Sequence, residues 1–234
     1  MSDSRPTLLV TRPAAQARRF AESFAERFGE DWPKLLAPMQ RIVGLNPEVP
    51  EARELVFTSE NAVAAYAALS PAAGRRAWCV GSRTAAAAAR AGFAPVTGPG
   101  DGAALTRIII AAAPQPPLLV ARGAHQAVDV AKALNSAGIE THSVCVYAQE
   151  PVPLSAAGEA ILARQSPLLV PLFSPRSAQL FVQAAKGARA PLWVAALSPA
   201  VAAPCAELHP ARMRIAATPD AESMLDALAK LVAG

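Results

Sequence analysis

The stretch LVFTSENAVAAY, residues 55–66, is an apolar run followed by small polar residues and then by a segment with the composition of a helix. The stretch PLFSPRSAQLF, residues 171–181, has the same outline. When the two are matched, Phe57 aligns with Phe173, 116 residues later. A strand, a polar turn and a helix start that occur twice indicate an internal duplication, and other segments should then repeat as well.

Three further pairs of segments repeat in the same order. LLVTR at residues 8–12 returns as LLVAR at 118–122. Each copy precedes a helical pattern that ends at a glycine, over 14–29 in the first copy and 124–138 in the second. The remaining pairs are 77–92 with 192–208, and 96–112 with 216–232. The repeat therefore predicts two tandem copies and, taken alone, a boundary near residue 115.

Short apolar runs alternate with alanine-rich segments throughout the chain, which is the pattern of βαβ units in parallel sheets. The 234 residues are enough for two domains of about 100–150 residues each. We expect an α/β protein with two flavodoxin-like parallel-sheet domains that arose from the repeat. Two proline-bearing stretches, 35–50 and 144–155, occupy matching positions after the first helix of each copy, and both are expected to be extended linkers.

Composition points to a soluble cytoplasmic protein. The formal net charge of +4 suits an anionic partner without identifying one. Cys79, Cys145 and Cys205 lack metal or redox spacing and are expected to be buried thiols. The N-terminus shows no signal-peptide pattern, and no apolar run reaches the roughly 20 residues that cross a bilayer.

Most common catalytic motifs are missing. The chain has no phosphate-binding P-loop and no Gly-x-Ser-x-Gly elbow. His125, His142 and His209 are scattered without metal spacing. His125 follows a strand end and could face a ligand, although a solvated helix start is the commoner role. Basic residues are not interleaved with aromatic ones, so a nucleic-acid partner is not expected.

Polar residues instead follow directly on the apolar runs. In parallel sheets these positions meet at the edge where ligands bind, close to the N–H groups that begin the next helix. Serine and threonine at such positions also serve as helix caps, and the sequence leaves both roles open. The positions are Thr11-Arg12, Thr58-Ser59, Gly81-Ser82, Arg122-Gly123, Ser174-Pro175 and Ser198.

These segments resemble the uroporphyrinogen-III synthase family. The resemblance covers essentially the whole chain and rests on the order and spacing of several short motifs. The motifs are TRP (11–13), VFTSENAV (56–63), VGSRTAAAA (80–88), VCVYAQEP (144–151) and LFSPRSA (172–178).

The resemblance implies a crosswise pairing of the two copies. One domain would combine residues 1–36 with 153–234, and the other would span 43–145. Residues 37–42 and 146–152 would form a two-stranded antiparallel hinge between them.

The resemblance also implies an activity. The family cyclises hydroxymethylbilane, a linear tetrapyrrole with eight carboxylates, and inverts ring D through a spiro-pyrrolenine intermediate. The product, uroporphyrinogen III, feeds heme, siroheme and cobalamin synthesis. This is a lyase reaction for which no cofactor or metal is implied. A monomer, supplied with substrate by hydroxymethylbilane synthase, is the expected form.

Carried over by motif, the substrate would contact a set of residues at the strand ends. Tyr147 matches the family's hinge tyrosine and is the candidate to assist departure of the hydroxyl as a general acid, or else it is structural. The loop after residue 196 departs from the family pattern, because it retains only Ser198 as a hydroxyl donor. The expected substrate-binding residues are Thr11, Arg12, Ser59, Asn61, Gly81, Ser82, Thr84, Arg122, Gly123, Ser174, Pro175, Arg176, Ser177 and Ser198.

Two other functions fit the same pattern. A non-catalytic two-lobed cytosolic protein that binds an anionic small molecule would use hinged lobes and polar strand ends equally well. An inactive paralogue would keep the fold and lose turnover. Neither would convert hydroxymethylbilane, which separates both from a synthase.

Overall fold

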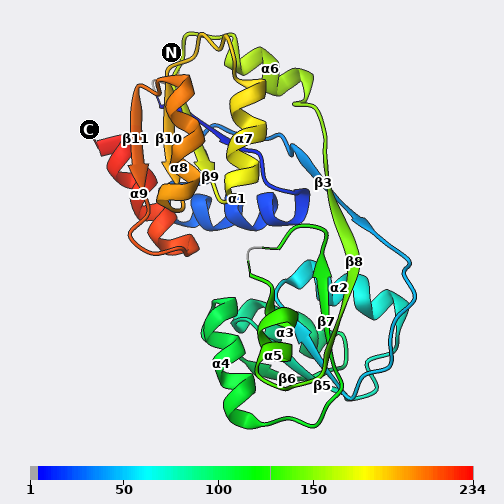
Figure 1. The fold of residues 1–234 in the computed structure, drawn as a ribbon. Helices are drawn as coiled ribbons and strands as arrows, with labels where there is room; N and C mark the ends of the chain where they lie inside the picture. The colour runs from blue at the N-terminus through cyan, green and yellow to red at the C-terminus, as the bar shows by residue number, and fades with distance from the viewer. Residues whose placement is uncertain (1–4, 127, 234) are drawn as a thin grey trace. The chain divides into compact units, whose positions relative to one another are not determined.

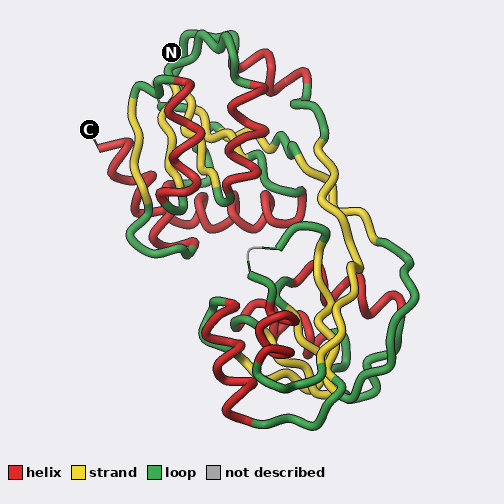
Figure 2. The backbone as a smooth tube through the Cα atoms, in the orientation of Figure 1, coloured by secondary structure: helices red, strands yellow, loops and turns green. Residues whose placement is uncertain are grey.

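A computed structural model describes residues 5–126 and 128–233, and these fold into two compact units. Unit 1 comprises the chain up to Arg41 and from Glu150 onward, and unit 2 comprises Ile42–Gln149. Figure 2 shows strands and helices in both units, and Figure 1 labels them in chain order. Within the described residues, no helix is long and apolar enough to cross a membrane.

Unit 1 contains a parallel sheet with the strand order β11-β10-β9-β1-β2. Alternate side chains of its strands enter different cores, Leu8 on one face and Leu9 on the other. A strand buried on both faces reads as a continuous apolar run, as these do. The strands are β1 (Thr7–Val10), β2 (Lys34–Leu36), β9 (Leu168–Leu172), β10 (Leu192–Ala196) and β11 (Arg212–Ile215).

Helices cover both faces of this sheet. Along α1, the buried residues Ala17, Phe20 and Phe24 recur at helical spacing and so form one apolar stripe. That stripe packs with α9 on one face, whereas α6, α7 and α8 pack on the other. The helices are α1 (Ala14–Phe28), α6 (Ala156–Leu162), α7 (Pro175–Ala184), α8 (Pro199–Cys205), the short 3-10 helix η1 (Ala206–Leu208) and α9 (Ala221–Ala233).

Unit 2 has the same design, with the strand order β3-β8-β7-β4-β5-β6. Helices α2 and α3 pack on one face, and α4 and α5 pack on the other. The strands are β3 (Gln40–Gly44), β4 (Glu54–Phe57), β5 (Arg76–Cys79), β6 (Ala94–Thr97), β7 (Leu118–Gly123) and β8 (Thr141–Pro151). The helices are α2 (Glu60–Leu69), α3 (Ser82–Arg90), α4 (Gly102–Ala112) and α5 (Val130–Ser136).

Each unit draws strands from both copies of the repeat. Strand β1 of the first copy pairs with β9 of the second, and β4 of the first pairs with β7 of the second. A boundary at residue 115, as the repeat alone predicts, is therefore wrong. With the first strand of a copy numbered 1, the sheet of unit 1 has the order 2-1-3-4-5 of flavodoxin-like folds, and the sheet of unit 2 has the same order with β3 added beside β8. The predicted α/β fold class is confirmed.

The structure corrects the alignment of the two copies by one residue. Ser59 caps α2 and Ser174 caps α7, and these equivalent positions lie 115 residues apart rather than 116. The sheet register agrees, because Leu8 pairs with Leu169 while its counterpart Leu118 pairs with Glu54. The sequence alignment matched Phe57 with Phe173 and was therefore wrong by one residue. The equivalent positions in the two copies are the helix N-caps, Ser59 and Ser174, and not the phenylalanines.

The chain passes between the units within β3 and within β8. The N–H of Leu45 donates to the carbonyl of Val146, and the N–H of Val152 donates to the carbonyl of Met39. These two bonds connect residues that run in opposite directions, so the strands are antiparallel. The stretch 35–50 is not wholly a linker as predicted, because it begins inside β2, which pairs with β1.

Helix boundaries differ from the sequence pattern in the second copy. The helix expected from residue 124 begins only at Val130, because Asp129 caps it and accepts a hydrogen bond from the N–H of Lys132. Caps also correct the last repeated pair by one residue. Asp101 accepts from the N–H of Ala104 and directly precedes α4, and Asp220 accepts from the N–H of Ser223 and directly precedes α9, so these positions lie 119 residues apart rather than 120.

The cysteines are free thiols in different environments. Cys79 and Cys205 are buried as expected, and burial raises the pKa of each thiol to about 11. Cys145 is only partly buried, so the prediction of burial is wrong for this residue. It lies beside the register shift of β8, where its thiol donates to the carbonyl of Tyr147.

The raised pKa values predict an alkaline loss of stability. In the unfolded chain these thiols ionise near their ordinary pKa of 9.0, but in the folded chain only near 11. The free energy of unfolding should therefore fall as the pH rises between these values. Replacing Cys79 and Cys205 together with alanine should make that fall shallower, in urea titrations with reductant at several pH values. Parallel pH dependences for the two proteins would contradict this prediction.

Candidate functional site

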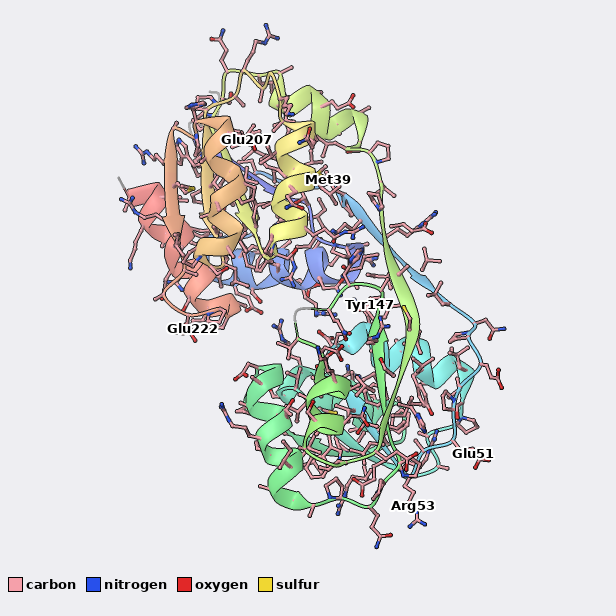
Figure 3. All side chains as sticks on the ribbon, in the orientation of Figure 1. Met39, Glu51, Arg53, Tyr147, Glu207 and Glu222 are labelled. Atoms are coloured by element: carbon pink, nitrogen blue, oxygen red, sulfur yellow. The ribbon has the colours of Figure 1, made fainter. Side chains whose placement is uncertain are left out.

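Tyr147 lies in unit 2 at the carboxyl end of the sheet, where a register shift sets its position (Figure 3). Arg122 pairs with Cys145, but the next residue, Gly123, pairs with Tyr147, so Val146 is an extra residue in β8. A bulge of this kind turns two consecutive side chains toward one face. Val146 and Tyr147 accordingly enter the same core, and Tyr147 is only 6% exposed.

Gly123 leaves the space that the ring of Tyr147 occupies. A Cβ atom at Gly123 would lie 2.6 Å from the Cζ atom of Tyr147 and 2.8 Å from its hydroxyl oxygen. The N–H of Ala124 also donates to the carbonyl of Tyr147. The position of Tyr147 is thus set by a hydrogen bond to its backbone and by the packing of its ring against Gly123.

Ser59 follows β4 and reaches the phenol across the end of β7, the strand that lies between β4 and β8. The Oγ atom of Ser59 lies 3.1 Å from the hydroxyl oxygen of Tyr147, and either hydroxyl can donate. Ser59 also caps α2 by accepting from the N–H of Ala62. A serine hydroxyl that accepts from a backbone N–H still has its own proton to donate. When Ser59 donates to Tyr147, the phenolic proton is left available for another acceptor.

Arg122 is oriented by its own strand and by its neighbour. Its Nε donates to the Oγ atom of Ser143 over 2.8 Å, and its Nη1 donates to the carbonyl of Gly123. Ser143 was not among the residues predicted from the sequence. It follows two other polar residues, Thr141 and His142, at the start of β8, and a serine there is too common a signal to mark a site.

The other predicted residues of unit 2 begin its helices. Gly81 is the N-cap of α3, and a Cβ atom there would lie 3.4 Å from the Cα atom of Gly100. Ser82 follows in the first turn and is exposed, whereas Thr84 is buried within the unit. Asn61 lies in the first turn of α2 and is partly exposed. His125 is exposed outside any helix.

In unit 1, residues that follow β1 and β9 lie together. The guanidinium carbon of Arg12 lies 3.9 Å from the centroid of the Phe173 ring, a cation–π contact that keeps the arginine at the strand ends. Thr11 is buried, and its carbonyl accepts from the N–H of Met39. Phe173 was missed as a site residue, although it directly precedes the predicted Ser174.

Helix α7 begins with a reciprocal cap. The Oγ atom of Ser174 accepts from the N–H of Ser177, and the Oγ atom of Ser177 accepts from the N–H of Ser174. Pro175 occupies the first turn, which suits a residue without an N–H. Arg176 follows it, in the same turn. Both serines therefore cap the helix, which is one of the two roles that the sequence left open. Their hydrogen bonds also hold the first turn of α7 in place.

Ser198 differs from these serines. It is the N-cap of α8, but its side chain makes no cap hydrogen bond, and its carbonyl accepts from the N–H groups of Val201 and Ala202. Its hydroxyl is thus not used by the helix. The loop has lost the other hydroxyls of the family pattern, so Ser198 and the backbone N–H groups are its remaining donors.

Both units therefore collect hydroxyl, guanidinium and backbone N–H donors where the strands end. This arrangement suits anionic groups. Within residues 5–126 and 128–233, no three His, Cys, Asp or Glu side chains gather in a way that could hold a metal ion.

Comparison with known proteins identifies a family. A sequence model of uroporphyrinogen-III synthase HemD matches residues 23–226. No sequence among curated proteins matches the chain.

Two solved structures share the fold. The crystal structure of uroporphyrinogen-III synthetase from Helicobacter pylori 26695 has a TM-score of 0.69 at 15% identity, and the match covers 97% of this chain and 100% of that one. A mutant uroporphyrinogen III synthase from the extremely thermophilic bacterium Thermus thermophilus has a TM-score of 0.55 at 16% identity, covering 98% and 99%. The sequence model spans well over half of the residues, and so this chain belongs to the uroporphyrinogen-III synthase family.

Proposed function

We propose that this chain is an active, cytoplasmic uroporphyrinogen-III synthase that works without a cofactor. As a lyase, it would close hydroxymethylbilane to uroporphyrinogen III with inversion of ring D. The family match carries the proposal. The Tyr147–Ser59 pair and the anion-binding strand ends of both units support it.

The chemistry needs positioning more than strong acids or bases. The electron-rich pyrroles of the substrate help to expel the hydroxyl of the ring A hydroxymethyl group, and the C–O bond breaks to give an azafulvene. The substituted carbon of ring D then forms the new C–C bond of a spiro-pyrrolenine, which fragments and closes again. Holding ring D for this attack is catalysis by orientation, which can lower a barrier greatly without a reactive side chain.

Donors at the strand ends suit a substrate with eight carboxylates. In unit 1 they come from Arg12, the first turn of α7, and Ser198. In unit 2 they come from Arg122 and the first turns of α2 and α3. N–H groups at a helix start bind anions without requiring a separate cation for each.

Tyr147 would donate its proton to the departing hydroxyl, so that water leaves. Ser59 would donate to the phenol oxygen, which orients the phenolic proton away from Ser59 and toward the substrate. Ser59 then acts through Tyr147 as a positioning residue.

The Tyr147→Phe variant tests this role. The ring and its packing stay, but the proton donor is lost, and we expect kcat to fall by about a hundredfold, the lower end for general acid catalysis. Activity should remain detectable because the pyrroles still expel the leaving group. If the variant turns over at the wild-type rate, Tyr147 is not the general acid of the reaction.

An isomer assay tests the function itself. Hydroxymethylbilane is generated in situ with hydroxymethylbilane synthase, the proposed supplier, and the oxidised type I and type III uroporphyrins are separated. We expect predominant type III product that depends on this protein. If only type I uroporphyrin forms, at the rate of a heat-inactivated control, the protein is not a synthase. It would then be a binding protein or an inactive relative.

A further inference from the structure

A cavity lies in unit 2, at the other end of the sheet from Tyr147. Figure 3 shows Arg53 and Tyr147 at opposite ends of this unit. The cavity is formed by the segment before β4, the end of α2 and the residue before β7, and has a volume of about 490 Å³. Small-molecule sites typically measure about 300–1,000 Å³.

Arg75 is fixed in the wall of this cavity by neutral partners. Its Nε donates to the carbonyl of Ala72, and its Nη2 donates to the Oγ atom of Ser70 and the carbonyl of Pro71. Its Nη1 donates to the hydroxyl of Tyr66 over 3.1 Å. A guanidinium has five N–H donors, so these bonds leave one on Nη1 for another acceptor. The side chain is held rigidly while its charge is not neutralised.

Tyr66 and Ser70 also keep a donor each. Both hydroxyls accept from Arg75, and within residues 5–126 and 128–233 neither proton has an acceptor. Tyr66 is only 1% exposed. Buried polar hydrogens nearly always find a partner, and the cavity that Tyr66 lines is where one can sit.

The charges of the lining favour an anion. Arg53 adds a second guanidinium, which is exposed and donates to the side chain of Gln115. No carboxylate of the described residues forms an ion pair with Arg53 or Arg75. Glu51, at the exposed rim, is the one carboxylate among the described residues that line the cavity. Two positive charges against one negative charge suit a monoanion better than water or a cation.

The rest of the wall is largely apolar. Val49, Leu69 and Pro117 line the cavity beside the polar groups. A ligand that filled the space would therefore carry an apolar part beside its anionic group.

We infer that this cavity, lined by Arg53, Tyr66, Ser70 and Arg75, binds a small monocarboxylate with a short apolar chain. The carboxylate accepts from the free N–H of Arg75 and the hydroxyl of Tyr66, and Arg53 closes the site from the rim. The chain of the ligand lies against Val49 and Leu69. The site precedes β4 and β7, whereas the donors of the proposed synthase reaction follow these strands, so the two sites are separate.

Titrations of the full-length chain test this site. Butyrate, hexanoate, hexanol and inorganic phosphate are each followed by isothermal titration calorimetry. We expect saturable binding of hexanoate, about tenfold tighter than butyrate because two further methylenes are buried. Hexanol, which lacks the charge, and phosphate, which lacks the chain, should bind more weakly than hexanoate.

Variants locate the binding. Arg53→Met changes an exposed side chain, and it should weaken hexanoate binding by about fivefold. Arg90→Met is the matched control, because Arg90 is an exposed arginine of the same unit outside the cavity, and it should leave hexanoate affinity unchanged. Tyr66→Phe should also weaken binding, with its folding checked by circular dichroism.

Each other outcome would overturn the inference. These are the absence of saturable hexanoate binding, equal binding of hexanol or phosphate, or equal weakening by Arg53→Met and Arg90→Met. Isomer assays of Arg53→Met should show wild-type synthase activity. Failure of this site and failure of the proposed function are therefore distinguishable, because each has its own readout.

Discussion

Replacing Phe57 with alanine is expected to lower the free energy of unfolding by about 3–5 kcal/mol, the usual cost of truncating a buried phenylalanine. The side chain of Phe57 is fully buried in unit 2. Its ring packs edge-on against Tyr66 at 5.8 Å and against Phe93 at 5.3 Å between centroids. The deletion would leave a cavity beneath α2 and remove both aromatic contacts. Urea titrations followed by circular dichroism measure the loss.

The Phe57→Leu variant serves as the control for this prediction. Leucine keeps most of the apolar volume, so the expected loss is below about 1.5 kcal/mol if the site repacks. Because Phe57 directly precedes the Thr58-Ser59 turn, the alanine variant should also reduce synthase activity at temperatures where it remains folded. If Phe57→Ala lowers the free energy of unfolding no more than Phe57→Leu does, the ring of Phe57 does not contribute to the core as proposed.

Replacing Gly123 with alanine is expected to displace Tyr147. The added Cβ atom would meet the Cζ atom of the ring at 2.6 Å and the hydroxyl oxygen at 2.8 Å, separations too short to persist. Because the ring is buried, it cannot move aside without breaking its contact with Ser59. We expect a stability loss of about 1–3 kcal/mol from overpacking and a fall in kcat at least as large as that of Tyr147→Phe.

A double variant separates the two effects of this change. If Gly123→Ala acts by displacing the phenol, adding Tyr147→Phe should lower kcat little further, since coupled residues are not additive. The control is Gly44→Ala, because a Cβ atom at Gly44 meets nothing within 4 Å. Additive losses in the double variant, measured in the isomer assay, would show that Gly123 and Tyr147 act independently.

Local patterns in the sequence do not determine how the strands of the two copies pair. Periodicity and caps are local properties, and they support tandem copies with a boundary near residue 115. The sheets instead pair β1 with β9 and β4 with β7. The strands of one copy could pair only with each other, or they could pair with strands of the other copy. Both arrangements bury the same apolar strands, so the apolar pattern of the sequence does not distinguish them.

By itself, the sequence determined the α/β class, the repeated strand–turn–helix units and the polar strand ends, because strand burial and helix capping depend on residues close together in the chain. Tertiary structure alone decided which side chains of the site meet. Ser59 contacts Tyr147, and Arg12 lies over Phe173. These contacts join residues that are distant in sequence. The bulge at Val146 and the space above Gly123 place the phenol. Such contacts depend on sheet register and on packing between strands, and no periodicity along the chain encodes either one.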